Sequence, residues 1–181
     1  MSAMIEKKVD ELSKKLDELK PGAKDKISMI VFSGDLDKVL AALIIATGAA
    51  AMGMEVVLFF TFWGTAALRA TKKKVTGKDL MSKMFGFMLP SGSSKLKLSK
   101  MNMGGMGTTM MKSLMKKKNV ASLEELIGLA GEFDVKVYIC EMSMDLMGFK
   151  REEMIDYPSL DYCGVATFLK EAENSKIQLF I

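Results

Sequence analysis

The chain has 181 residues and a formal net charge of +4, and 49% of its residues are hydrophobic, which is typical of one globular domain. It contains no histidine, so catalytic triads built on histidine and most zinc and haem sites are excluded. Its two cysteines, Cys140 and Cys163, are too few and too far apart for a disulfide framework or a structural zinc site, so no metal is expected. The first residues lack an apolar signal core, and we therefore expect a cytoplasmic, reducing location.

A heptad helix is predicted for residues 1–22, ahead of the main domain at residues 26–181. Its apolar residues alternate at spacings of four and three on an otherwise charged helix, and Pro21-Gly22 ends it. The apolar residues are Ile5, Val9, Leu12, Leu16 and Leu19. The pattern fits either a helix that packs on its own domain or a short coiled-coil arm used in assembly, since about two heptads are marginal alone.

The first part of the main domain reads as strand, helix and strand. Residues 26–32 are mostly apolar and predict a buried strand. A helix over 36–52 follows, with Asp35 as its N-cap and Gly53 just beyond its end. Residues 55–61 predict a second buried strand. A hydropathy window over 39–63 also resembles a membrane span, but the Gly53 break and the charge of Glu55 favour a helix followed by a strand.

The rest of the chain continues this alternation. Ser122 and Glu125 form a capping box at the start of a helix through about Ala130. The other predicted elements are a helix over 66–74, a helical stripe over 80–88, a helix over 110–117, a strand over 135–139, a helix over 165–173 and a strand over 176–181. Alternating strands and helices of these lengths predict an α/β fold with a parallel sheet and helices on both faces.

A lysine- and methionine-rich insert interrupts the domain at residues 72–118. It holds twelve lysines and one acid, Asp79, which gives +11 against −7 for the rest of the chain, and nine of the 18 methionines. It fits a solvated lysine face over methionines that fill a local core, a lid or docking surface for an acidic partner, or peripheral contact with an anionic membrane. Nucleic acid is the weakest partner, because the insert has no arginine and no pattern of stacking aromatics.

Sites in open α/β sheets lie beyond the carboxyl ends of the strands. Cys140 stands at such an end, and a helix that begins near Ser143 would direct its N–H groups toward the sulfur and favour a thiolate or persulfide. Glu141 and Asp145 oppose that effect. Three loops would share this edge, and their candidate site-lining residues are Ser33, Gly34, Asp35, Trp63, Gly64, Met142 and Ser143. The edge lacks a glycine fingerprint for flavin or nucleotide, so no cofactor is expected.

The segment from Lys136 to Gly148, with Cys140 at its centre, resembles the strand–cysteine–helix signature of the DsrE/DsrF/TusD-like sulfur-relay proteins, in particular a longer DsrE-like branch with a methionine-rich insert. The Ser33-Gly34-Asp35 turn, the run from Met101 to Gly107, the capping box and the segment from Gly164 to Phe168 fit the same resemblance, which covers about residues 27–181. It implies a flavodoxin-like parallel sheet, a homo-oligomer, and sulfur donor and acceptor carrier proteins as partners.

The resemblance also implies that Cys140 accepts sulfane sulfur as a persulfide and passes it to an acceptor thiol, with Trp63 and the methionines as a shield. Cys163 falls where the family pattern has glycine, so no role carries over to it, although a resolving thiol is one reading. The alternative function is a non-catalytic oligomeric adaptor or a membrane-surface-associated protein on the same fold.

Overall fold

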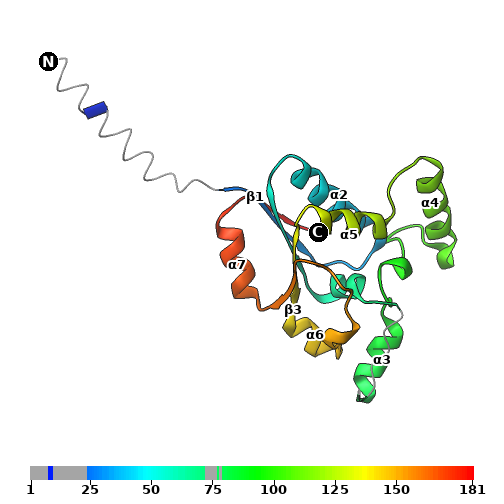
Figure 1. The fold of residues 1–181 in the computed structure, drawn as a ribbon. Coiled ribbons are helices and arrows are strands. Elements are labelled where there is room, and N and C mark those ends of the chain that lie inside the picture. The colour runs from blue at the N-terminus through cyan, green and yellow to red at the C-terminus, as the bar shows by residue number, and fades with distance from the viewer. Residues whose placement is uncertain (1–7, 10–23, 72–76, 78) are drawn as a thin grey trace.

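The computed structural model describes residues 8–9, 24–71, 77 and 79–181. Its centre is a sheet of five parallel strands in the order β4-β3-β2-β1-β5 (Figure 1). The strands are β1 (Lys24–Val31), β2 (Glu55–Phe60), β3 (Lys136–Cys140), β4 (Leu160–Cys163) and β5 (Ser175–Phe180). The parallel sheet expected from the alternation of strands and helices is confirmed.

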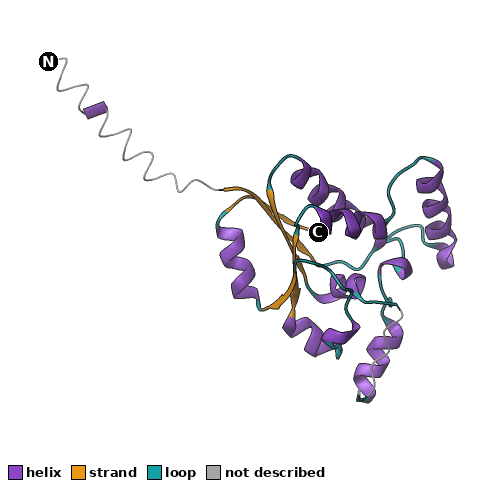
Figure 2. Ribbon diagram, in the orientation of Figure 1, coloured by secondary structure: helices purple, strands orange, loops and turns teal. Residues whose placement is uncertain are grey.

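Helices cover both faces of the sheet (Figures 1 and 2). The α-helices are α2 (Leu36–Ala51), α3 (Leu80–Met88), α4 (Met106–Lys117), α5 (Leu123–Glu132), α6 (Glu141–Met147) and α7 (Val165–Glu173). The 3-10 helices are η1 (Phe62–Leu68), η2 (Ser93–Lys95), η3 (Met103–Gly105) and η4 (Arg151–Glu153). No helix in these described ranges is long and apolar enough to cross a membrane. Residues 39–63 instead form most of α2 and all of β2, as predicted.

The two faces of the sheet carry separate hydrophobic clusters, because alternate residues of each strand point to opposite sides. The larger cluster joins one side of β1, β2 and β3 to α2, α5 and α6. The smaller one consists of Val57, Phe59, Cys140, Cys163, Phe168 and Ala172. It lies between the other side of β2, β3 and β4 and helix α7, so both cysteines are core residues of the α7 face.

Three sequence predictions need correction or fall outside the described residues. The helix predicted over 66–74 is wrong for its described residues, 66–71, since the chain forms η1 and leaves it at Leu68 to make an antiparallel bridge from Arg69 to Met154. Strand β4 was not predicted, because its four residues show no apolar alternation and only Cys163 among them is buried. Of the predicted heptad helix over 1–22, only residues 8–9 are described, so that prediction is not tested.

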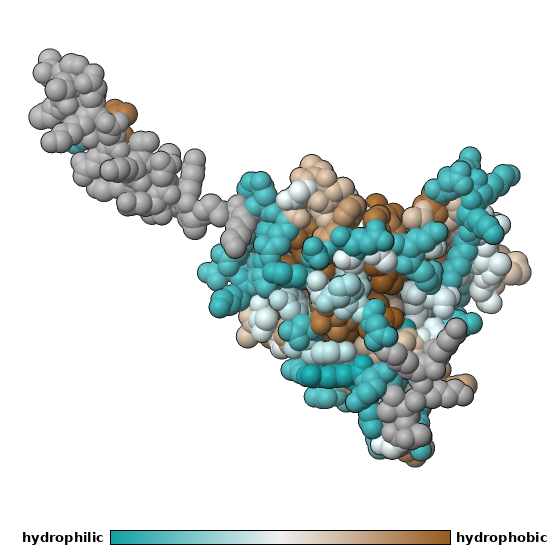
Figure 3. All heavy atoms as spheres, viewed as in Figure 1, coloured by the Kyte–Doolittle hydropathy of each residue, from teal (hydrophilic) through white to brown (hydrophobic). Residues whose placement is uncertain are grey.

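In its described residues the insert adds Leu96 to the larger cluster but forms no separate cluster. Helix α3 has no buried residue, and large apolar side chains such as Phe87 and Met88 are exposed on it. Arg69 joins this region to the body: its guanidinium donates to the carbonyl oxygens of Gly86, Leu89 and Pro90 and pairs with Glu153 at 3.4 Å. Figure 3 shows hydrophilic side chains over much of the surface in this view, with apolar patches between them.

Candidate functional site

The two cysteines end neighbouring strands and lie side by side. Cys140 is the last residue of β3, Cys163 is the last residue of β4, and the two are register partners in the parallel ladder. Both are free thiols, 4% and 8% exposed respectively, and both belong to the cluster on the α7 face. Register partners in a parallel pair point to the same face, so the fold brings together two sulfurs whose residues lie 23 positions apart in the sequence.

The chain leaves β3 and β4 toward opposite faces of the sheet. After Cys140 it enters α6, whose Met144 and Met147 pack in the larger cluster. After Cys163 it enters α7, whose Phe168 packs in the smaller one. Ligands of open α/β sheets bind where adjacent strands diverge in this way, outside their carboxyl ends. The thiol pair therefore occupies the topological switch point of the sheet.

The helix after Cys140 begins two residues earlier than the sequence predicts. Helix α6 starts at Glu141 rather than near Ser143, and Cys140 itself is the N-cap residue. Ser143 is fully buried: its hydroxyl accepts a hydrogen bond from the N–H of Phe62 at 3.0 Å and lies 2.9 Å from the hydroxyl of Thr61. Ser143 therefore fixes α6 against η1, while Met142 is exposed on the outer side of α6.

Burial keeps Cys163 protonated. Burial is the largest cause that raises the pKa of this thiol to about 11, and the negative charges of Asp161, Cys140 and Glu141 add to it. A hydrogen bond with the side chain of Thr167 acts in the opposite direction. At pH 7 the Cys163 side chain is therefore a neutral thiol.

The acidic residue beside Cys140 has a cationic partner that the sequence did not reveal. Arg151 of η4 forms an ion pair with Glu141, and its guanidinium lies over the ring of Tyr162, 4.5 Å from the centroid. The pair is exposed, so it contributes little to stability. It nevertheless offsets the charge of Glu141, which the sequence reading set against a thiolate at Cys140.

Helix α7 covers the thiol pair and is held mainly by polar contacts at its far end. Lys26, a buried residue of β1, pairs with Glu171 of α7, and the hydroxyl of Tyr138 donates to Glu171 at 3.0 Å. Near the cysteines, Phe168 stacks on Phe59 with the ring centroids 5.0 Å apart. Because Cys140 is 4% exposed, a donor reaches its sulfur only when this cover moves.

Four of the other candidate residues line a separate pocket after β1 and β2, whereas Gly64, Met142 and Ser143 do not line it. Ser33, Gly34, Asp35 and Trp63 form one wall of it. Insert residues form the opposite wall: Phe87, Met88, Leu89, Pro90, Ser91, Lys95 and Lys97. Cys140 does not line this pocket, so the structure divides the predicted site into a pocket bordered by the insert and a buried thiol pair.

Two glycines allow the loops at this edge to touch through their backbones. A Cβ on Gly34 would lie 2.6 Å from the carbonyl oxygen of Trp63, and a Cβ on Gly64 would lie 2.2 Å from that of Val31. No other residue fits at these distances without movement of the backbone. Asp35 is the N-cap of α2, as predicted, but its carboxylate accepts from the Ser33 hydroxyl at 2.9 Å rather than from the helix.

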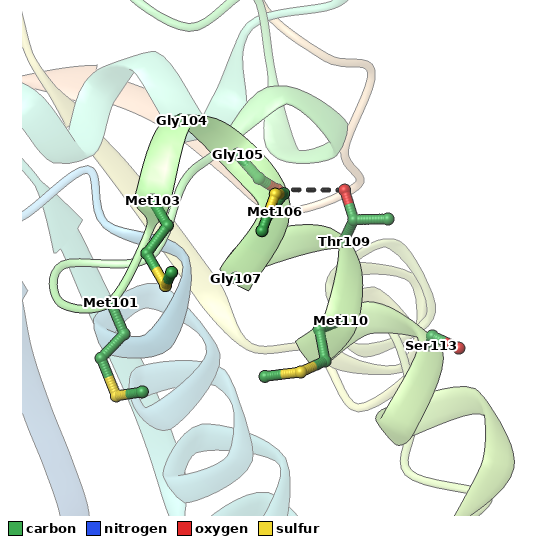
Figure 4. A pocket seen from close by; sticks show the side chains of 9 residues that line it. All are labelled: Met101, Met103, Gly104, Gly105, Met106, Gly107, Thr109, Met110 and Ser113. Carbon is green, nitrogen blue, oxygen red and sulfur yellow. Dashed lines mark hydrogen bonds between the residues drawn. The ribbon is translucent and has the colours of Figure 1, made fainter.

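A second pocket is formed entirely by the methionine–glycine run and the start of α4 (Figure 4). Its lining residues are Met101, Met103, Gly104, Gly105, Met106, Gly107, Thr109, Met110 and Ser113. In Figure 1, α4 projects from the side of the molecule opposite α7, so this pocket does not belong to the thiol site. In the part of the chain that the structure describes, no group of three or more Cys, Asp or Glu side chains could hold a metal ion.

Sequence reasoning found Cys140 but missed what surrounds it. It left a resolving thiol as one reading of Cys163 and gave no role to Arg151 or Tyr162, because it did not predict strand β4, which pairs Cys163 with Cys140 and carries Tyr162. The one available signal was Cys163 directly before Gly164 and a predicted helix, which repeats the strand–cysteine–helix order found at Cys140.

Known proteins resemble this chain over most of its length. Residues 23–180 match the model of the DsrE/DsrF/DrsH-like family. A Bacillus subtilis protein named uncharacterized protein YrkE is 49% identical over 85% of this chain and 95% of its own, and the sulfur carrier protein DsrE2 of Allochromatium vinosum is 40% identical over 86% and 98%. The crystal structure of YchN from E. coli shares the fold, with a TM-score of 0.50 at 10% identity over 86% of this chain and 98% of its own. The chain therefore belongs to the DsrE/DsrF/DrsH-like family.

Proposed function

We propose that this protein is a sulfur carrier that takes sulfane sulfur on Cys140 as a persulfide and passes it to an acceptor thiol. The observation that carries the proposal is the position of Cys140, at the switch point of the sheet and directly before α6, in a chain 40% identical to a protein named as a sulfur carrier. The absence of histidine from the sequence fits this chemistry, since sulfur transfer between thiols needs no histidine base.

The transfer consists of two thiol exchange steps. The Cys140 thiolate attacks the outer sulfur of a donor persulfide, the donor S–S bond breaks, and the donor leaves as a thiolate. An acceptor thiolate then attacks the outer sulfur of the Cys140 persulfide and releases the Cys140 thiolate. Helix α7 must move for either partner to approach the Cys140 sulfur. Only Phe168 and Ala172 of this helix are buried, so its apolar contact with the sheet is small and it can move while the rest of the fold stays in place.

Intact mass after exposure to a low-molecular-weight persulfide donor tests this proposal. The wild-type chain should gain one sulfur, peptide mapping should place that sulfur on Cys140, and an acceptor thiol should remove it. Cys140→Ala should gain none. Ser122→Ala is a matched control, since it removes a helix cap far from the thiols and should gain sulfur as the wild type does. A gain that persists in Cys140→Ala would refute the assignment.

A second candidate role is attachment to an anionic membrane surface through residues 72–118. The exposed apolar side chains of α3, among them Phe87 and Met88, combined with the lysines of the insert, favour it. Sedimentation with vesicles tests this role. Binding to vesicles with anionic lipid, loss of binding at high salt, and no binding to neutral vesicles would support it. Equal binding to both kinds of vesicle, or to neither, would exclude it.

A further inference from the structure

Cys163 is the one thiol that can reach a sulfur held on Cys140 without any partner. The two residues are paired in the ladder between β3 and β4, and adjacent strands lie about 4.7–4.9 Å apart. Disulfides form between residues whose Cα atoms are about 4.4–6.8 Å apart, so the backbone spacing already suits a bond. Both side chains point into the same cluster under α7.

We propose that Cys163 is a resolving thiol, which converts the Cys140 persulfide into a Cys140–Cys163 disulfide and releases the carried sulfur as hydrogen sulfide. This inference rests on the proposed function, because it begins from the Cys140 persulfide. It adds an activity, reductive release of sulfur, to the transfer between carriers.

The reaction balances without an external oxidant. The Cys163 sulfur attacks the inner sulfur of the persulfide, which is Sγ of Cys140, and the bond from Sγ to the outer sulfur breaks. The outer sulfur leaves with the bonding electron pair and takes up the proton of the Cys163 thiol. One sulfane sulfur is reduced to sulfide while two cysteine sulfurs are oxidised to a disulfide. A cellular dithiol reductant then restores both thiols by exchange.

The setting of Cys163 explains why it does not compete with Cys140 for a donor. It is buried, it is almost entirely protonated at pH 7, and a thiolate at Cys140 disfavours a second one beside it. A thiol of high pKa is nevertheless a strong intrinsic nucleophile once its proton has an acceptor, and the departing sulfur is that acceptor. Cys163 is therefore inactive toward an incoming donor but is placed to attack a persulfide held beside it.

The sheet allows the small movement that the bond requires. Disulfide formation needs the Cβ atoms to approach to about 3.5–4.5 Å. Strand β4 has four residues, lies at the edge of the sheet and is paired only with β3, so its last residue can shift toward Cys140. Thr167 lies in the first turn of α7, and the hydrogen bond between its side chain and the Cys163 thiol positions the sulfur.

The test compares wild type with Cys163→Ala, without oxygen and after removal of the donor. Both should first gain one sulfur. The wild type should then lose it in favour of a product lighter than the free chain by two hydrogens, with one sulfide released per disulfide, at a rate independent of protein concentration. Cys163→Ala should keep its sulfur at least tenfold longer and form no such product. Peptide mapping should join Cys140 to Cys163.

Three outcomes would overturn the inference: equal persulfide lifetimes in the two proteins, a disulfide without matching sulfide, or a rate proportional to protein concentration. If neither protein gains sulfur at the start, the proposed function itself fails. Cys163→Ser is a second variant that removes the thiol with little change in size, and it should behave as Cys163→Ala does. Circular dichroism confirms that each variant is folded before loading.

Discussion

The two faces of the sheet are built differently. On one face α2, α5 and α6 pack against uniformly apolar strand residues such as Leu58 and Phe60, which are completely buried. On the other face a single helix, α7, packs Phe168 and Ala172 against four buried strand residues, which include both thiols. On the same side of β1 the buried residues Lys26 and Ser28 are polar, and Ile30 packs against the cluster.

Because of this difference, one face contributes most of the stability of the fold and the other holds the reactive thiols. The α2 and α5 face buries most of the apolar surface and therefore supplies most of the hydrophobic stabilisation. The α7 face holds the reactive residues beneath a helix of nine residues, of which only Phe168 and Ala172 are buried. A cover with so few apolar contacts can open locally while the rest of the fold remains intact.

The largest expected effects come from removing one buried aromatic side chain on each face of the sheet. Phe60→Ala should lower the free energy of unfolding by about 3–5 kcal/mol, and Phe168→Ala by about 3 kcal/mol, as measured by urea denaturation. Alkylation of Cys140 should accelerate in both variants. In Phe168→Ala the rate should be nearly independent of low urea concentrations, because only α7 opens, whereas in Phe60→Ala it should follow global unfolding. Equal urea dependence in the two variants would contradict a separately opening helix.

A smaller effect is expected at the polar anchor of α7. Glu171→Gln removes the charge that pairs with Lys26, but Lys26 retains Glu55 at 3.2 Å. The loss should therefore be about 1–2 kcal/mol, below the cost of about 3–5 kcal/mol for a buried charge left without any partner. Cys140 alkylation should become faster. An unchanged alkylation rate would mean that Glu171 does not hold the cover closed.

Acid should weaken the same anchor. A hydrogen bond from Lys136 is the largest cause that lowers the pKa of Glu55, and Lys26 contributes to it. Burial alone would raise the pKa of Glu171, but hydrogen bonds from Lys26 and Tyr138 lower it overall. The stability that these carboxylates contribute is present above their ordinary pKa, about 4.3, and is lost as the pH falls through the lowered values. Urea denaturation between pH 6 and pH 3, in about one-unit steps, should show a smaller decline for Glu171→Gln than for wild type.

The smallest effect is expected on the other face. Ser122→Ala removes the hydroxyl that accepts from the N–H of Glu125 and breaks the capping box of α5. It should cost about 1 kcal/mol, measured by thermal or urea denaturation, and leave Cys140 alkylation in folded protein unchanged. Faster alkylation in this variant would show that the two faces are coupled.

Local signals predicted most of this fold. The period of the apolar residues gave β1, α2, β2, β3, α7 and β5 close to their observed bounds, and the Ser122 box correctly marked the start of α5. Strand β4 was not predicted, because a strand at the edge of a sheet needs no apolar alternation. It forms a strand through its pairing with β3.

The candidate site was predictable only in part, for a related reason. Cys140 could be found because it follows an apolar strand, whereas its partner Cys163 depends on tertiary register, which no local pattern encodes. Trp63 and the Ser33-Gly34-Asp35 turn were placed at the correct edge of the sheet, but the insert encloses them in a pocket of their own.

The close backbone contacts at Gly34 and Gly64 limit which substitutions the sequence can accept at this edge of the sheet. Each loop occupies space that a single methyl group on the other would need, so the turns after β1 and β2 behave as one rigid block. Adaptation to a new sulfur donor or acceptor is therefore restricted on that half of the sheet edge. Variation should accumulate instead in α7, in the short strand β4 and on the surface of α6, where a substitution can reshape the approach to the thiols without disturbing a backbone contact.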